Sequence, residues 1–170
     1  GFDPGNLISM DYLWTPWRYK YITEKVSEEG CVFCQIAESN DDETNLVVHR
    51  GKDNFVVLNR YPYNSGHAMV LPFRHVATLG TLGEDVAAEM MRLTQQLETT
   101  VRKLYRSEGV NVGMNIGKAA GAGVAGHIHM HVLPRWIGDS NFETVVAETR
   151  VLPEELPETW RRLRDEFRRV

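Results

Sequence analysis

Three histidines at alternate positions, within residues 126–134, constrain this chain more than any other feature. The side chains of a strand point alternately to its two faces. His127, His129 and His131 would therefore form a row of imidazoles on one face of a strand, with the intervening apolar residues buried on the other. Histidine has no particular preference for strands, so packing alone does not explain the pattern. We favour catalysis; a structural metal site and a chance alternation of polar residues are the alternatives.

Length and composition indicate an ordinary globular protein. The chain has 170 residues, of which 42% are hydrophobic and 25% charged, and this fits one domain with a proper core. The net charge of −4 argues against bulk nucleic-acid binding. Because there is neither a membrane-length apolar run nor a signal-peptide pattern, we expect a cytoplasmic protein without a membrane partner.

The N-terminal region divides into two parts. Residues 1–9 show little periodicity and precede Met10, so we interpret them as a cloning remnant, with a functional arm as the alternative, and residues 10–170 as one domain. Residues 13–22 contain four aromatic side chains. We expect these to pack on the core or on a dimer partner, the alternative being stacking on a nucleobase.

The remaining patterns predict an α+β fold with an antiparallel sheet of about five strands. Strand-like runs cover residues 46–49, 54–59, 67–72, 110–116 and the histidine segment, and 143–147 is a candidate last strand. A short helix is expected after Cys31. One long helix is expected to start at a capping box formed by Thr81 and Glu84 and to stop at residues 107–109. A C-terminal helix is expected at Leu156, Trp160, Leu163 and Phe167.

The segment before the histidines, residues 117–126, contains four glycines and four alanines. Such a loop can adopt positive φ and bring several backbone N–H groups near an anion. It lacks the ending of a P-loop, and a flexible hairpin connection would look the same. Because it leads directly into the histidines, we interpret it as a phosphate cradle.

Neutral imidazole is a good nucleophile near pH 7. Attack on phosphorus by one ring nitrogen forms a phosphoramidate and splits one difficult displacement into two easier ones. The flanking histidines can donate to phosphate oxygens or to the leaving group. His129 alone has an imidazole neighbour on each side in this pattern, so we predict it as the nucleophile.

The histidine segment resembles the signature of the histidine-triad (HIT) family of nucleotide hydrolases and transferases. Residues 55–59 and 66–72 are similar to the family's first half, and residues 13–18 and 134–142 resemble its diadenosine-tetraphosphate phosphorylase and Fhit-type branch. The resemblance implies a HIT-like fold and a homodimer. It also implies that His129 forms the nucleotidyl intermediate, that His131 contacts phosphate near the leaving group, and that His127 and His67 support the site.

The resemblance further implies a set of substrate contacts. Asn59 would hold the ribose and Asn115 would contact phosphate, and the remaining oxygens would bind to backbone N–H groups at Gly121, Ala122, Gly123 and Val124. Many relatives carry Gln-Ser or Gln-Thr in this loop. Here those side-chain donors are missing, so the backbone and Lys118 remain, and substrate choice is affected more than chemistry.

Two cysteines, Cys31 and Cys34, have the C-x-x-C spacing of a zinc site or a redox pair, and the spacing alone does not choose between these and no function. Zinc prefers four N or S ligands in structural sites. In zinc-containing bacterial members of the resembled family, the other two ligands correspond to His75 and His127. We therefore predict structural zinc on these four residues and no organic cofactor.

The predicted function is cleavage of dinucleoside polyphosphates, such as diadenosine tetra- or triphosphate, at the α-phosphate through a nucleotidyl-histidine. Water as acceptor would make the enzyme a hydrolase, and orthophosphate would make it a phosphorylase. The alternatives are a purine nucleoside phosphoramidase, a nucleotide-binding sensor with little turnover, and a transition-metal redox site.

Overall fold

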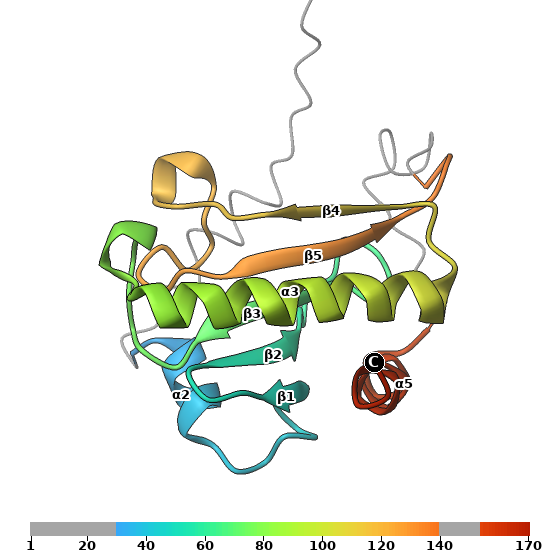
Figure 1. Ribbon diagram of the computed structural model, residues 1–170, viewed down its shortest axis with the longest axis horizontal. Helices are drawn as coiled ribbons and strands as arrows, with labels where there is room; N and C mark the ends of the chain where they lie inside the picture. The colour runs from blue at the N-terminus through green and yellow to red at the C-terminus, as the bar shows by residue number, and fades with distance from the viewer. Residues whose placement is uncertain (1–29, 140–153) are drawn as a thin grey trace, which may run out of the picture.

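The fold is an antiparallel five-stranded sheet with helices packed against it, as a computed structural model of the chain shows for residues 30–139 and 154–170 (Figure 1). The strand order is β1-β2-β3-β5-β4, and every neighbouring pair is antiparallel. The α+β prediction is thereby confirmed. The predictions for residues 1–9, 13–22 and 143–147 lie outside the described residues. The strands are β1 Val47–Arg50, β2 Asn54–Leu58, β3 Ala68–Pro72, β4 Gly109–Gly113 and β5 Met130–Arg135.

The central strands β2 and β3 are buried at every position. They pair antiparallel, as expected, and the register places Val56 opposite Val70. The long helix α3, Glu84–Tyr105, crosses one face of the sheet and buries Leu97 and Val101 completely (Figure 1). Burial at every position explains why these two strands lack the clear alternation of a half-buried strand.

The predicted capping box of α3 is wrong. Thr81 ends a short 3-10 helix, η1 (Leu79–Thr81), and its hydroxyl donates to the carbonyl of Thr78, while Gly83 occupies the N-cap position without a side-chain cap. The helix ends at Tyr105, before the predicted stop at residues 107–109. Arg106 caps it in the left-handed conformation (φ 49°), which is more usual for glycine.

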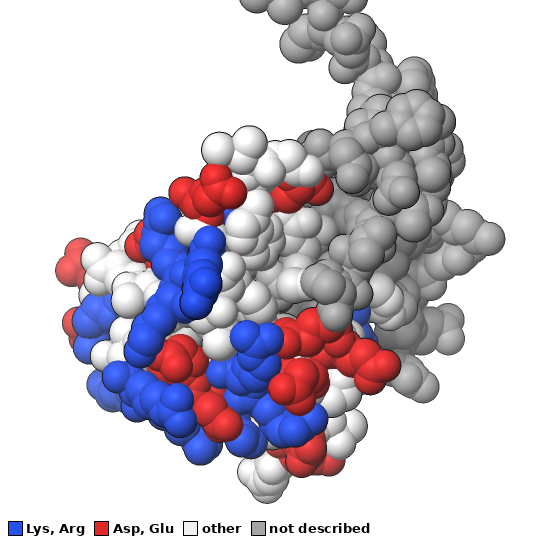
Figure 2. Space-filling view, turned by 90° about the vertical axis from the view of Figure 1, so that its right-hand side faces the viewer, with Lys and Arg blue, Asp and Glu red and all other residues white. Residues whose placement is uncertain are grey.

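The closing helix α5, Leu156–Phe167, confirms the C-terminal prediction and packs on α3 and β1. Trp160 donates its indole N–H to the carbonyl of Val47 at 2.8 Å. Figure 2 shows basic and acidic side chains interspersed on the surface. Arg162 of α5 forms an ion pair with Glu154, just before this helix, and Lys103 of α3 forms one with Glu166 of α5. Among the described helices, none has the length and apolarity that a membrane crossing requires.

The histidine strand begins later than predicted. β5 starts at Met130, so His127 and His129 precede it, outside the regular strand. The N–H of Ile128 donates to the carbonyl of Val76 at 2.8 Å, and this bond holds the segment to the chain that follows β3 instead of to the sheet ladder. Ile128 is buried together with the two histidines, so the expected division into a buried and an open face does not hold here.

Candidate active site and metal site

Four predicted histidines meet beside the sheet. His67 immediately precedes β3, and its ring centroid lies 5.1 Å from that of His131 on β5. The His131 ring lies 4.8 Å from that of His129. Antiparallel pairing of β3 with β5 produces this meeting, because it places Met69 opposite His131. His127 lies at the other end of the row, next to His75, with 5.3 Å between ring centroids.

The His129 ring is fixed by a main-chain acceptor. Its Nδ1 lies 2.9 Å from the carbonyl oxygen of His127, and because a carbonyl only accepts, Nδ1 carries the proton. The lone pair of the neutral ring is then on Nε2. Burial lowers the pKa of His129, although the hydrogen bond to the His127 carbonyl opposes this effect. His129 is therefore a neutral imidazole with a defined nucleophilic nitrogen at pH 7.

His67 and His131 form a chain of hydrogen bonds with a defined direction. The backbone N–H of Tyr63 donates to His67 Nδ1 at 3.1 Å, so the proton of the His67 ring is on Nε2. That Nε2–H donates to His131 Nδ1 at 2.9 Å. The proton of neutral His131 is consequently on its own Nε2, and this nitrogen is a hydrogen-bond donor.

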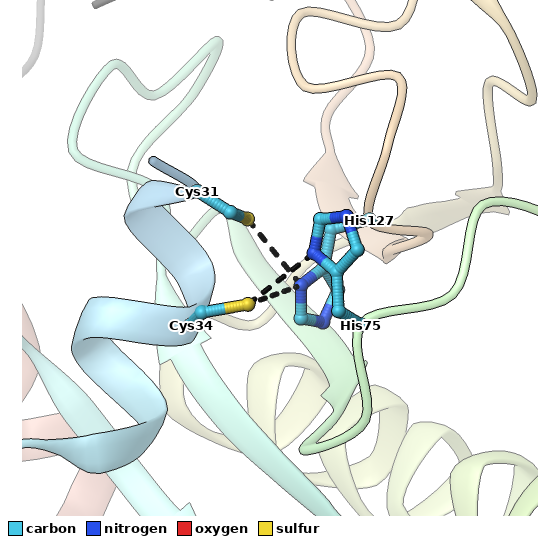
Figure 3. A group of neighbouring side chains, drawn as sticks. All are labelled: Cys31, Cys34, His75 and His127. Atoms are coloured by element: carbon cyan, nitrogen blue, oxygen red, sulfur yellow. Dashed lines mark hydrogen bonds between the residues drawn. The ribbon is translucent and has the colours of Figure 1, made fainter. Parts of the chain in front are cut away.

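The two cysteines and two further histidines form a compact cluster (Figure 3). One ligand atom from each of Cys31, Cys34, His75 and His127 lies within 4.8 Å of the others. Cys34 Sγ is 3.3 Å from His75 Nδ1 and 3.7 Å from His127 Nδ1, and Cys31 Sγ is 3.5 Å from His127 Nδ1. The cysteines belong to the start of helix α2, Val32–Glu38, which was predicted as a short helix.

This donor set fits a tetrahedral zinc ion. Zn–S and Zn–N bonds of about 2.3 and 2.0–2.1 Å place neighbouring S and N ligands about 3.6 Å apart, close to the separations in the cluster. His127 Nε2 donates to the carbonyl of Pro72 at 2.8 Å, so its Nδ1 lone pair faces the sulfurs. Burial and the neighbouring Cys31 raise the pKa of the Cys34 thiol to about 11, and a bound cation would reverse this and favour the thiolate.

Three features that sequence analysis missed support the metal cluster. Phe33, on the buried face of α2, packs its ring 5.2 Å from that of His129. Arg50 donates to the carbonyls of Ile36, Ala37 and Ser39 and thereby holds the C-terminus of α2. At Gly126, a Cβ would lie 3.2 Å from His75 Nε2, so glycine leaves room for that ring. Phe33 lies within the C-x-x-C segment, and this position was a reason to consider it. No local sequence pattern points to Arg50 or Gly126.

The two asparagines that were predicted to bind substrate differ in how the structure places them. Asn59 accepts the N–H of Tyr61 with its side-chain oxygen at 3.0 Å, and its side-chain nitrogen lies 3.4 Å from His67 Nδ1. Asn115 follows β4, which ends at Gly113, short of the predicted residue 116.

In the glycine-rich loop, Lys118 is exposed within a short 3-10 turn, η2 (Lys118–Ala120). Gly121 and Ala122 donate their N–H groups to the carbonyls of Lys118 and Gly117. A phosphate contact from either N–H would replace these loop bonds, while the roles of Gly123 and Val124 stay predictions.

Comparison with known proteins identifies the relatives of this chain. The family model described as "HIT domain" matches residues 40–136. A Mycobacterium tuberculosis protein named AP-4-A phosphorylase is 40% identical over 173 residues, which cover 97% of this chain and 88% of the relative.

Solved structures show the same fold. A zinc-bound histidine triad family protein from Mycobacterium smegmatis superposes with a TM-score of 0.68 and 29% identity, covering 82% of this chain and 94% of the other. A hypothetical histidine triad nucleotide-binding protein from Sulfolobus tokodaii gives a TM-score of 0.66 and 25% identity, covering 82% and 93%.

Proposed function

The chain belongs to the HIT-domain family, and we propose that it is an enzyme that cleaves dinucleoside polyphosphates of the diadenosine-tetraphosphate kind at an α-phosphate. One observation carries the proposal: His129 is a buried, neutral ring with Nδ1 bonded to a carbonyl, so that Nε2 is its nucleophilic atom. The 40% identity with an AP-4-A phosphorylase over nearly the whole chain supports the choice of substrate class.

In the first half-reaction, His129 Nε2 attacks the α-phosphorus. The N–P bond forms, the P–O bond to the remaining nucleoside phosphates breaks, and its electron pair leaves with that oxygen. The His129 ring becomes cationic, and the His127 carbonyl, 2.9 Å from Nδ1, stabilises the positive charge. His131 Nε2–H donates to the oxygen that becomes negative, as a prearranged donor does in an oxyanion hole.

In the second half-reaction, an oxygen of water or orthophosphate attacks the same phosphorus. The P–N bond breaks, and its electron pair returns to His129 Nε2. With water the products are a nucleoside monophosphate and a proton released to solvent, and with orthophosphate the product is a nucleoside diphosphate. We propose orthophosphate as a competent acceptor, by analogy with the phosphorylase relative.

Mass spectrometry tests the covalent step. Protein is exposed briefly to a diadenosine polyphosphate, quenched without acid and digested. A mononucleotide adduct on His129 is expected, and the same mass on His49, a half-buried histidine at the far side of the sheet, is not. Turnover without any adduct on His129, under conditions that trap intermediates, would overturn the mechanism.

Product analysis tests the acceptor. The cleavage products are separated after reaction with and without orthophosphate, and a nucleoside diphosphate is expected to contain phosphorus from labelled orthophosphate. Exclusive formation of monophosphate with oxygen from labelled water would make the protein a hydrolase instead.

We also propose that Cys31, Cys34, His75 and His127 bind one zinc ion with a structural role. All four positions are provided by protein side chains, and this closed arrangement is typical of structural sites. Bound zinc would supply cross-linking of α2 to the triad segment. Elemental analysis of tag-free protein, purified without chelator, is expected to give one zinc per chain, and protein free of bound metal would contradict the proposal.

A homodimer is proposed from the family resemblance. In the described sheet β4 is an edge strand, and its Val112 is 47% exposed. An exposed edge strand is a surface on which a second sheet can pair. Light scattering is expected to give twice the 19.4 kDa mass of the chain.

A further inference from the structure

We propose that Asn64 and Asp139, which lie outside the histidine cluster, are positioning residues that determine which ring nitrogen of His67 and His131 carries the proton. The two residues connect the β2–β3 loop to the end of β5 by one side-chain hydrogen bond of 3.1 Å. The effect of this hydrogen bond on catalysis rests on the proposed function, whereas its effect on the proton positions of His67 and His131 does not.

Asp139 is the centre of a local network. Its carboxylate accepts from Arg135 Nε at 2.6 Å, from Arg135 Nη2 at 2.7 Å and from the backbone N–H of Trp136 at 3.1 Å. These bonds, above all those from the Arg135 guanidinium, lower the pKa of Asp139 to about 2. The carboxylate is therefore ionised at neutral pH, and its side chain is only 10% exposed. A charged acceptor of this kind makes strong hydrogen bonds with fixed geometry.

Asn64 transmits this fixed position to the β2–β3 loop. Its side-chain nitrogen donates to Asp139 and to the carbonyl of Pro134, and its own carbonyl accepts the N–H of His67 at 3.2 Å. Gly66 closes the loop against α3, where a Cβ would lie 2.5 Å from the Tyr105 ring. The loop is thus held on two sides.

The loop holds the backbone N–H of Tyr63 at 3.1 Å from His67 Nδ1, a shorter contact than the 3.4 Å between this nitrogen and the side-chain nitrogen of Asn59. The two tautomers of a neutral imidazole are close in energy, so a donor held at a fixed position beside one ring nitrogen selects between them. Loss of the tie at Asn64 would release the Tyr63 N–H from its place. Both rings could then exchange tautomers, because the His67 Nε2–H is what sets the proton of His131.

Nitrogen-15 NMR of the histidine rings tests this directly, since protonated and unprotonated ring nitrogens have different shifts. In the full-length wild-type chain, His67 and His131 are each expected to show a single Nε2–H tautomer. In Asn64→Ala and Asp139→Asn, the two nitrogen signals of each ring are expected to move toward each other. The Nδ1–H of His129 donates to the carbonyl of His127, outside this network, so the nitrogen shifts of His129 are expected to stay as in the wild type in every variant.

Asn111→Ala is the matched control. Asn111 accepts from Arg135 Nη1 at 2.7 Å, so this variant removes a bond of the same network without touching the loop. It should leave both tautomers as in the wild type. Unchanged tautomers of His67 and His131 in folded Asn64→Ala and Asp139→Asn would overturn the proposal and reduce the network to a stabilising role. If Asn64→Ala does not fold, Asp139→Asn, which preserves side-chain volume, decides.

Kinetics separate this inference from the proposed function. With a diadenosine polyphosphate, kcat of Asn64→Ala is expected to fall about 10-fold with KM nearly unchanged, because a misaligned donor stabilises the transition state less. If the wild type shows no turnover, the proposed function fails and the tautomer result still stands on its own. If the wild type turns over and the tautomers do not respond, the inference alone fails.

Discussion

The two ends of the histidine row are held by different means. At one end, the His127 ring donates to a main-chain carbonyl and turns its other nitrogen to two sulfurs. At the other end, His131 accepts from His67, which accepts from a loop N–H. At the first end, the His127 Nε2–H donates to a main-chain carbonyl, and the Nδ1 lone pair is directed at the two sulfurs of the candidate metal site. The second end has its Nδ1 occupied and its proton on Nε2.

This difference shows how histidines within the five positions from His127 to His131 can be prepared for different chemical roles. The role that we propose for each ring follows from which of its nitrogens is hydrogen-bonded. His127 and His129 each donate to a main-chain carbonyl, whereas His131 accepts from the His67 ring. His129, between the two ends, has the proton on Nδ1 and the lone pair on Nε2. The proposed ligand, nucleophile and donor would thereby be distinguished without any change of amino acid.

The largest expected effect is at the centre of the row. His129→Ala removes the proposed nucleophilic nitrogen, and kcat is expected to fall by at least about 10⁴-fold, because the proposed covalent route depends on this atom. Steady-state cleavage of a diadenosine polyphosphate measures this. His49→Ala is the control and should keep wild-type kcat. Near-normal turnover by His129→Ala would remove the distinction between the centre of the row and its ends.

At the donor end, His67→Ala removes the bond that sets the proton of His131. We expect kcat to fall about 10²-fold, in the range of a lost oxyanion donor, with little change in bound metal. Steady-state kinetics and elemental analysis of the same His67→Ala preparation measure the fall in kcat and the metal content. Loss of zinc together with activity would show that the two ends are not independent.

At the ligand end, Cys34→Ser is expected to affect metal binding first. Removing a group that merely supports a ligand weakens metal affinity about 10–100-fold, so loss of a ligand itself should weaken it further. Competition with a chromophoric chelator measures the affinity. Gln35→Ser, one position along α2, is the control for the change in helix propensity. Retention of wild-type zinc affinity by Cys34→Ser would contradict the assignment of the cluster.

A third region, which makes no direct hydrogen bond to the histidines in the described residues, sharpens the comparison because it should affect stability alone. The buried Glu89 carboxylate accepts from the N–H groups of Lys52 and Asp53 and from the Asn54 side chain. Glu89→Gln is expected to lower the free energy of unfolding by about 1–3 kcal/mol, with kcat unchanged. Urea denaturation measures this. Glu98→Gln on the same helix removes only a solvent-accessible ion pair with Arg102 and should change the free energy of unfolding by less than about 0.5 kcal/mol.

The smallest expected effect is a pH dependence at that same carboxylate. Burial alone would raise the pKa of Glu89, but hydrogen bonds from Asn54 and from backbone N–H groups of the β1–β2 turn outweigh it, so the folded-state pKa is lowered. Its stabilising contribution is therefore present above the unfolded pKa of about 4.3 and is lost as pH falls through the lower folded value. The stability difference between wild type and Glu89→Gln should shrink on acidification, and a difference that grows would be inconsistent with this sign.

Patterns local in sequence predicted much of this molecule. The alternating histidines, the C-x-x-C pair and the apolar spacing of α3 and α5 each specify an element within a short window, and the ligand positions His75 and His127 followed from family resemblance. The start of α3 was wrong because the Thr81 hydroxyl bonds within its own turn. The late start of β5 could not be predicted, because Val76, about fifty residues away, takes the N–H of Ile128.

Contacts between distant segments escaped prediction for the same reason. The bond between Asn64 and Asp139 joins residues 75 positions apart, and no pattern in the sequence connects the two. Arg50 reaches the end of α2 from the following strand, with three carbonyls as acceptors. Such positions become visible only when the sheet has brought the segments together.

The distance in sequence between the cysteines and His127 has a consequence for biosynthesis. Cys31 and His127 are 96 residues apart, although their ligand atoms lie 3.5 Å from each other. A ribosome therefore releases both thiols and His75 well before the fourth ligand has been translated. A nascent chain can capture zinc with three donors at most, and complete coordination has to wait until the histidine segment leaves the exit tunnel.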